Sequence, residues 1–147
     1  MLKVTVAEEV EALKLYLDIE KVRFDERLQL HFDIDTEARS ALMPSLLLQP
    51  LVENSIKHAV SQAINGGSIS IAASVSGQSL HLRVADDGPG LELQHSGMPR
   101  SDGVGLMNCR ERLKEIYGSK QSFRLGATDP HGLTVTITIP LEREEVT

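Results

Sequence analysis

Apolar and polar residues alternate along five short segments of the chain. The apolar positions of these segments are Leu28, Leu30, Phe32 and Ile34; Ile69, Ile71, Ala73 and Val75; Leu80, Leu82 and Val84; Phe123 and Leu125; and Leu133, Val135, Ile137 and Ile139. The positions between them are mostly polar, whereas strands that are buried on both faces read as continuous apolar runs. The pattern therefore predicts a largely antiparallel sheet with one covered face and one solvent-exposed face.

Three further segments carry apolar residues at the spacing of an α-helix. The first begins with a capping box at Thr5–Glu8 and runs to about Arg23. Its buried face consists of Val6, Val10, Leu13 and Leu17. The second occupies about Ser45–Ala63, and the third about Val104–Tyr117, with Gly118 as a C-terminal stop. The order helix, strand, helix, two strands, helix, two strands predicts a two-layer α/β sandwich, in which three helices cover one face of a mixed, mostly antiparallel five-stranded sheet.

Composition and charge narrow the possible partners. The chain has 147 residues, of which 41% are hydrophobic, so it can bury the core of one compact domain. A net charge of −6 and scattered basic residues argue against a nucleic-acid surface. The single cysteine, Cys109, excludes an internal disulfide and fits a reducing compartment. No apolar run approaches the ~20 residues that span a bilayer, so we expect soluble material.

The middle helix carries polar residues beside its apolar face. At about 100° per residue, its buried stripe consists of Leu48, Val52, Ser55 and Ala59. Asn54 and His58 lie on the flank, where the amide of Asn54 could meet a ligand and a hard cation such as Mg²⁺. Lys57, on the opposite face, could give a positive charge to a phosphate. Taken alone, however, the helix fits an ordinary solvated face with an ion pair between Glu53 and Lys57 better.

A carboxylate ends the strand that contains Leu80, Leu82 and Val84. Strand alternation points Asp86 into the apolar layer and Asp87 the other way. A buried carboxylate is costly unless hydrogen-bond donors reach it, and the exocyclic amine of a purine in an apolar slot would be such a donor. Gly88 and Gly90 would let the backbone approach a ligand closely. The alternative is that residues 86–90 form an ordinary turn, which these residue types favour.

The third candidate segment is Gly103–Leu106, at the start of the last helix. Two glycines at the start of a helix expose backbone N–H groups and the positive end of the helix dipole, which together can bind an anion. This signal is weak alone, and no phosphate-loop lysine motif occurs. The preceding residues, 91–102, have no periodicity and predict a mobile loop over the site. Cys109 falls on the apolar face of the helix and is expected to be a buried hydrophobe rather than a nucleophile.

In this order, the three segments resemble the N, G1 and G2 boxes of the ATPase superfamily that includes histidine kinases, DNA gyrase, Hsp90 and MutL. The details are most similar to LytS/YehU-type sensor histidine kinases. The matching segments are Tyr16–Glu20 with Arg23 and Phe24, Leu48–His58, Asp86–Gly90, Gly103–Asn108 with Arg112 and Leu113, Tyr117 with Gly118, and Gly132–Pro140. They run through most of the chain, and their combination is far more specific than any one of them. The resemblance implies a Bergerat-type fold.

The resemblance also implies roles for individual residues. Asn54 would coordinate Mg²⁺, and Lys57 would contact a phosphate of ATP. Asp86 would bind the adenine amine, and the glycine pairs would shape the pocket and hold the phosphates under a lid of residues 91–102. The implied ATP-binding positions are Asn54, Lys57, His58, Asp86, Gly88, Gly90, Gly103, Val104, Gly105 and Leu106.

The chain departs from the family pattern at several positions, which include Ser101, where a further glycine is common, and Leu133, where a threonine is common. Two departures bear on activity. Pro50 stands where gyrase-type members carry a water-activating Glu, which argues against an ATP-hydrolysing machine. None of the five histidines lies on an early helix, where a phosphoacceptor belongs; they are His31, His58, His81, His95 and His131. We therefore expect an excised catalytic domain at residues 25–147, preceded by a junction helix at residues 1–24 that follows a missing dimerisation and phosphoacceptor region.

The resemblance implies an ATP:protein-histidine phosphotransferase domain of a two-component system, with ATP and Mg²⁺ as its cofactors. Its expected partners are the upstream dimerisation and phosphoacceptor domain and a cognate response regulator, with a homodimer in the full-length kinase and no nucleic acid. Its expected location is the cytoplasmic side of an inner-membrane sensor protein. The alternative is a nucleotide-binding scaffold module without phosphotransfer, against which the intact Asn54, Lys57 and Asp86 count.

Overall fold

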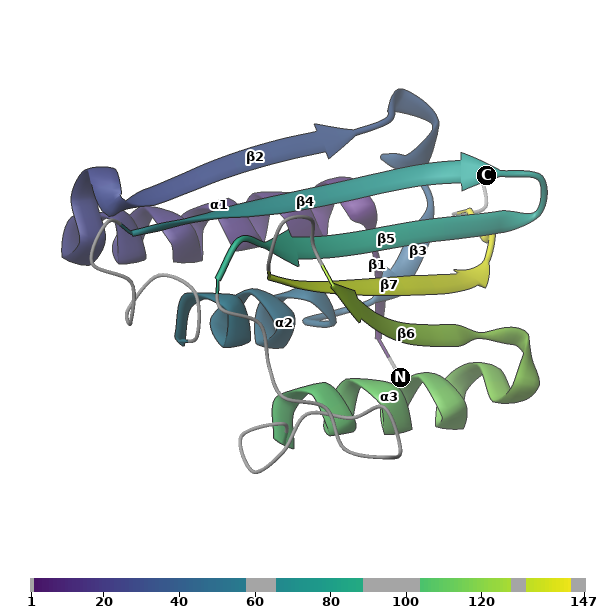
Figure 1. Cartoon of the computed structure of the whole chain (residues 1–147). Coiled ribbons are helices and arrows are strands. Elements are labelled where there is room, and N and C mark those ends of the chain that lie inside the picture. Colours follow the sequence, from purple (N-terminus) through teal and green to yellow (C-terminus); the bar gives the residue numbers. More distant parts are fainter. Residues whose placement is uncertain (1, 58–65, 89–103, 128–131, 144–147) are drawn as a thin grey trace.

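The fold is built on a five-stranded sheet with strand order β2-β4-β5-β7-β6 (Figure 1). The structure is a computed structural model that describes residues 2–57, 66–88, 104–127 and 132–143. The strands are β2 (Leu28–Ile34), β4 (Gly67–Ser76), β5 (Ser79–Asp86), β6 (Ser122–Ala127) and β7 (Leu133–Pro140). The pair β2–β4 is parallel and the other three pairs are antiparallel, which confirms the predicted mixed, mostly antiparallel sheet.

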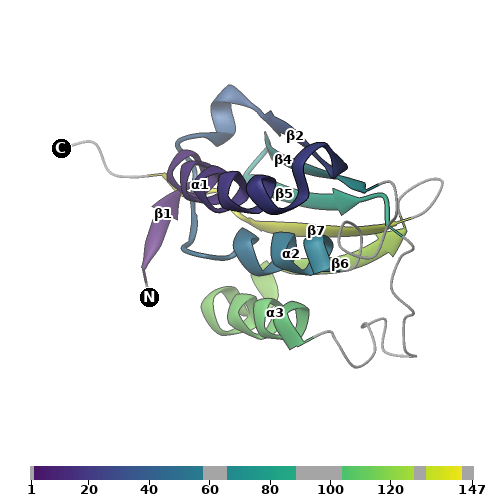
Figure 2. The ribbon, with the colours of Figure 1, turned by 90° about the vertical axis from the view of Figure 1, so that its left-hand side faces the viewer.

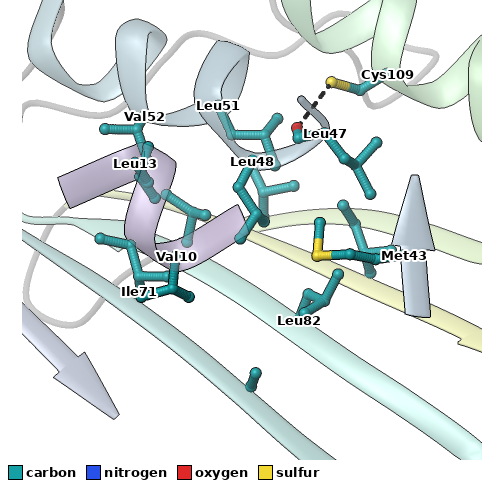
Figure 3. Close-up of a cluster of buried hydrophobic side chains, with 14 of the residues drawn as sticks. Val10, Leu13, Met43, Leu47, Leu48, Leu51, Val52, Ile71, Leu82 and Cys109 are labelled. Atoms are coloured by element: carbon teal, nitrogen blue, oxygen red, sulfur yellow. Dashed lines mark hydrogen bonds between the residues drawn. The ribbon is translucent and has the colours of Figure 1, made fainter. Parts of the chain in front are cut away.

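Helices α1 (Val6–Phe24), α2 (Leu48–Ser55) and α3 (Val104–Tyr117) form the second layer, with α2 between the other two (Figure 2). Side chains from α1 and α2, such as Leu13 and Leu48, point toward Ile71 and Leu82 of the sheet (Figure 3). These inward strand positions are buried, as the alternation of apolar and polar residues predicted. The two-layer α/β sandwich is thereby confirmed.

Local sequence signals set two of the helix ends. The capping box at the start of α1 is present, because the Thr5 side chain accepts a hydrogen bond from the Glu8 backbone N–H at 3.1 Å. In return, the Thr5 backbone and hydroxyl donate to the Glu8 carboxylate and lower its pKa. Helix α3 ends at Tyr117, and Gly118 follows with a φ of +61°, the left-handed conformation that glycine adopts most readily.

The start of α2 differs from the prediction. The helix begins at Leu48, three residues later than the predicted Ser45, because Leu46 adopts a φ of +58° that is incompatible with a right-handed helix. The predicted continuation of this helix to Ala63 reaches residues 58–65, which lie outside the described residues.

Two short strands were not predicted. β1 (Lys3–Thr5) pairs with β3 (Leu42–Pro44) in a separate antiparallel ribbon, and three residues are too few to show a periodicity in the sequence. Short 3₁₀ turns follow α1 and α3 at Asp25–Arg27 and Gly118–Lys120. Among the described residues, no helix is both long and apolar enough to cross a membrane.

Candidate functional site

The described parts of the three candidate segments meet at one end of the molecule. The end of α2, the end of β5 and the start of α3 lie on the same side in Figure 1, together with the start of β7. Gly90 and Gly103 lie outside the described residues, as do His58 and the predicted lid at residues 91–102. The described part of the site therefore consists of helix and strand ends.

Asp86 is buried at the end of β5, with 5% of its surface exposed, so its predicted inward orientation is confirmed. Its Oδ1 atom accepts hydrogen bonds from the backbone N–H of Gly88 at 3.0 Å and of Leu133 at 3.2 Å. These two donors compensate for the burial of the charge. Among the described residues, no group donates to the Oδ2 atom, which leaves this oxygen available to a ligand.

Gly132 makes the contact between Asp86 and Leu133 possible. Its φ is +133°, and a Cβ atom at this position would lie 1.9 Å from the backbone oxygen of Asp86. Only glycine therefore lets the start of β7 approach the end of β5 this closely. Gly132 was part of the family match, but this function was not predicted; its signal in the sequence is a glycine directly before an alternating strand.

The carboxylate of Asp87, the next residue, forms a hydrogen bond within the sheet instead. Asp87 is exposed, as predicted, and its Oδ1 atom accepts a hydrogen bond from the Ser68 N–H at 2.8 Å. The Asp87 N–H donates in turn to the Ser68 backbone oxygen at 3.3 Å. Asp87 thus joins the end of β5 to the start of β4, while Asp86 faces the helical layer.

Helix α2 presents the predicted N-box residues at this end. Val52 and Ser55 are buried, Asn54 is half-buried and Lys57, just beyond the helix, is exposed. Asn54 therefore lies at the boundary between the core and solvent, as the helical spacing predicted. Its amide oxygen is a suitable ligand for a hard cation, and the Lys57 ammonium can approach an anion from solvent.

The start of α2 is held by a carboxylate from another helix. Glu9 of α1 is buried with 4% exposed; its Oε1 atom accepts from the Leu46 N–H at 2.9 Å, and its Oε2 atom from the Leu48 N–H at 3.0 Å. A carboxylate at this point satisfies free N–H groups and interacts favourably with the helix dipole. This role of Glu9 was not predicted, although a glutamate directly beside the apolar Val10 is a signal in the sequence.

Helix α3 binds the same segment from the other side. The guanidinium of Arg112 donates to the backbone oxygens of Ser45 at 2.9 Å and Leu46 at 3.3 Å. The thiol of Cys109 donates to the Leu47 backbone oxygen at 3.6 Å (Figure 3). Burial raises the Cys109 pKa to about 11, so the thiol stays protonated at neutral pH and the predicted apolar role is confirmed.

The start of α3 lies against the first turn of α2. A Cβ atom added to Gly105 would be 3.9 Å from Cβ of Pro50, an ordinary contact distance. Leu106, the next residue, is fully buried, and Val104 begins the helix. The second glycine of the G2 box and the proline of the N box are therefore neighbours, with the positive end of the α3 dipole beside them.

The chain is similar to one protein family and to several named proteins. The profile of the family described as "Histidine kinase-, DNA gyrase B-, and HSP90-like ATPase" matches residues 41–143. Sensor histidine kinase YesM of Bacillus subtilis is 35% identical over 143 residues, which are 97% of this chain and 25% of that protein. Sensor protein LytS of Enterococcus faecalis is 30% identical over 151 residues, with coverages of 97% and 26%. The chain thus spans about a quarter of the length of these relatives.

The fold also matches a solved structure. The catalytic domain of the histidine kinase ThkA superposes with a TM-score of 0.75 at 17% identity, over 97% of this chain and 98% of that domain. The relatives and the fold are those of the ATP-binding catalytic module of two-component sensor kinases. The family model matches most of the chain. The chain therefore belongs to the family of histidine kinase-, DNA gyrase B- and HSP90-like ATPases.

Proposed function

We propose that the chain binds ATP together with Mg²⁺ and presents the γ-phosphoryl group to a histidine on a dimerisation and phosphoacceptor domain outside this chain. The observation that carries the proposal is the hydrogen bonding of the Asp86 carboxylate. Its Oδ1 atom is fixed by the N–H groups of Gly88 and Leu133, and no described group donates to Oδ2. An oxygen of a mostly buried carboxylate that has no donor among the described residues fits the exocyclic amine of adenine.

The residues around Asp86 fit the rest of the nucleotide. The half-buried amide of Asn54 supplies an oxygen ligand for Mg²⁺, and the exposed Lys57 supplies a positive charge for a phosphate. The dipole of α3 offers partial positive charge at Val104 and Gly105, and the phosphates would lie against this helix start. When bound, Mg²⁺ would neutralise charge on the phosphate oxygens.

In this proposal, the chain promotes the reaction by positioning ATP relative to the acceptor histidine. An imidazole nitrogen of the acceptor attacks the γ-phosphorus, the bond to the oxygen that bridges the β- and γ-phosphates breaks, and ADP leaves with that oxygen. Asp86 fixes the base, while Asn54, Lys57 and the α3 start orient the phosphates so that the attacking nitrogen and the leaving oxygen are in line. This mechanism requires no nucleophile from the chain itself.

The proposal extends to the partners and the location. Residues 1–24 would be the junction with the phosphoacceptor domain, and residues 25–147 the ATP-binding domain. A cognate response regulator would take the phosphoryl group from the acceptor histidine. The full-length kinase would be a homodimer, with this domain on the cytoplasmic side of an inner-membrane sensor. The names of the relatives, which are sensor histidine kinases, support these assignments.

Two substitutions at adjacent residues test the pocket. Asp86→Asn keeps the Oδ1 acceptor for Gly88 and Leu133 but places an NH₂ group where the adenine amine would donate. We expect isothermal titration calorimetry with Mg-ATP to show about a hundredfold weaker binding, because two donors then face each other. Asp87→Asn is the matched control, because its side chain lies on the other face and can still accept from Ser68. Equal losses for both variants would contradict the pocket assignment.

Phosphotransfer needs a separate measurement. The full-length protein, incubated with radiolabelled ATP, is expected to gain a phosphoryl group that is labile in acid and stable in base, as a phosphohistidine is. Asp86→Asn should abolish the label and Asp87→Asn should preserve it. Intact Mg-ATP binding without any such label would favour the scaffold function over the kinase.

A further inference from the structure

Helix α1 has a second apolar face that packs against nothing in the described structure. Leu15, Ile19 and Val22 have 69%, 70% and 82% of their surfaces exposed. Ala12 is exposed one turn before Leu15. The helix therefore carries apolar side chains on two sides, since Val6, Val10, Leu13 and Leu17 are buried against the sheet and α2. We call Ala12, Leu15, Ile19 and Val22 the α1 stripe.

The α1 stripe has the spacing of a coiled-coil seam. The steps from Ala12 to Leu15, Ile19 and Val22 are three, four and three residues, so Ala12 and Ile19 occupy a positions and Leu15 and Val22 occupy d positions of a heptad repeat. At about 100° per residue, the α1 stripe lies opposite the buried face of the helix. A partner helix could therefore dock along it without disturbing the core.

The residues that flank the α1 stripe specify the partner. In the same heptad, Asp18 occupies the g position and Arg23 the following e position; both are exposed. Neither residue forms an ion pair among the described residues, although Arg23 lies over the Phe24 ring at 4.9 Å. In a parallel in-register pair of α1 helices, Asp18 faces the partner's Arg23 on both sides of the seam. An antiparallel pair would instead face Asp18 with the partner's Asp18.

We propose that two copies of this chain associate through the α1 stripe, with their α1 helices parallel and in register. A β-branched residue at a and leucine at d, as in Ile19 and Leu15, favour two-stranded packing. The seam covers fewer than two full heptads, so the association of the isolated chain is weak and becomes strong where another contact already holds two chains together. The proposal rests on exposure, spacing and charge alone, and it does not depend on ATP binding.

The state of association tests the α1 stripe directly. We expect sedimentation equilibrium of this 147-residue chain, without nucleotide, to show a reversible monomer–dimer equilibrium at high protein concentration. Ile19→Lys should leave a monomer at every concentration and should preserve the far-UV circular dichroism, because the side chain is 70% exposed. Met107→Lys, on α3 and 51% exposed, is the control and should dimerise like the unmodified chain. A chain that stays monomeric, or an Ile19→Lys variant that still dimerises, overturns the proposal.

Charge exchange and cross-linking test the orientation. Asp18→Arg and Arg23→Asp should each weaken the dimer about tenfold, and the double variant should restore it, because the pairs reform with reversed signs. In the parallel arrangement, Ala12→Cys should form a disulfide-linked dimer under mild oxidation, since a positions face each other. If Ala12→Cys cross-links only when mixed with Val22→Cys, the helices are antiparallel and the proposed arrangement is wrong.

Discussion

Glu9 and Asp86 are both buried carboxylates, and each accepts two backbone N–H groups, but they use their oxygens differently. Glu9 receives one bond on each oxygen, from Leu46 and Leu48. Asp86 receives both bonds on Oδ1. Both oxygens of Glu9 therefore accept bonds from its own protein, whereas Oδ2 of Asp86 receives none from the described residues. The proposed binding role of Asp86 thus depends on this pattern of oxygen use, because burial alone does not distinguish it from Glu9.

The surroundings of the two residues fit this division. Glu9 lies within the helical layer, between α1 and the start of α2, where its charge interacts with the helix dipole. Asp86 lies at the end of β5, where the chain leaves the sheet. A carboxylate within a layer can hold elements together, and one at the end of a sheet can meet a ligand. Substitutions at or beside each residue can test this division.

The largest expected effect comes from Gly132→Ala. The added Cβ would overlap the backbone oxygen of Asp86 in a conformation that alanine resists, so β7 must move away and Asp86 must lose the Leu133 donor. We expect the free energy of unfolding to fall by about 3 kcal/mol and Mg-ATP binding to be lost, as followed by urea denaturation and calorimetry. Gly126→Ala on β6, where the new Cβ meets nothing within 4 Å, is the control. Equal stability of the two variants would contradict the assigned role of Gly132.

The next largest effect is expected when each of the two acids, Glu9 and Asp86, is replaced by its amide. Glu9→Gln replaces one acceptor oxygen with an NH₂ donor that faces a backbone N–H, so the free energy of unfolding should fall by about 2 kcal/mol. Asp86→Asn should change stability by less than about 1 kcal/mol, because Oδ1 still accepts both bonds, while its Mg-ATP affinity collapses. Glu11→Gln, an exposed position on the same helix, is the control for Glu9. If Asp86→Asn destabilises the fold as much as Glu9→Gln does, the distinction between the two acids fails.

A smaller effect is expected from Arg112→Lys. An ammonium cannot reproduce the two bonds that the guanidinium donates to Ser45 and Leu46, so stability should fall by about 1 kcal/mol in urea denaturation. Since Arg112 and Glu9 hold the same segment, their variants should be non-additive in a double-mutant cycle. The same cycle with Asp86→Asn should be additive. Additivity in both cycles would show that Arg112 and Glu9 act separately.

The smallest expected effect is on the pH dependence of the free energy of unfolding. Burial raises the Cys109 pKa from its ordinary value of 9.0 to about 11, so the unfolded chain loses its thiol proton first and this contribution to stability is lost as pH rises from 9 to 11. Burial also raises the pKa values of Tyr16 and Tyr117 from 10.0 to about 12, so their losses begin at higher pH. Cys109→Ala should flatten the fall in unfolding free energy between pH 9 and 10, measured by urea denaturation. An unchanged slope would contradict the assignment.

The sequence predicted most of the fold because the relevant signals are local. Residues two apart in a strand share a face, so alternation located all five strands of the main sheet and turned Asp86 inward. The capping box at Thr5 and the glycine at 118 marked helix ends for the same reason. These signals involve residues within a few positions of one another, so they do not depend on contacts with distant parts of the chain.

The missed features depend on contacts between distant residues. Glu9 meets Leu48 across 39 positions and Asp86 meets Leu133 across 47, and no periodicity reports such a pairing. The late start of α2 is a consequence of the same contact, because Glu9 and the left-handed Leu46 define the first free N–H of the helix. Helix position and residue chemistry left the roles of Asn54 and Lys57 open, and the family resemblance favoured Mg²⁺ and phosphate binding; both roles stay predictions.

The segment at residues 45–48 has a mechanical consequence. Its amides are bonded to a side chain of α1, its carbonyls to side chains of α3, and it runs directly into α2. Hydrogen bonds resist sliding because they weaken steeply with distance and angle, whereas apolar contacts can slip past one another. We therefore expect a displacement of α1 along its axis to strain the Glu9 hydrogen bonds before it disturbs the apolar contacts, and so to act on the first turn of α2, the helix that carries Asn54. Side-chain hydrogen bonds thus connect all three helices at this one segment.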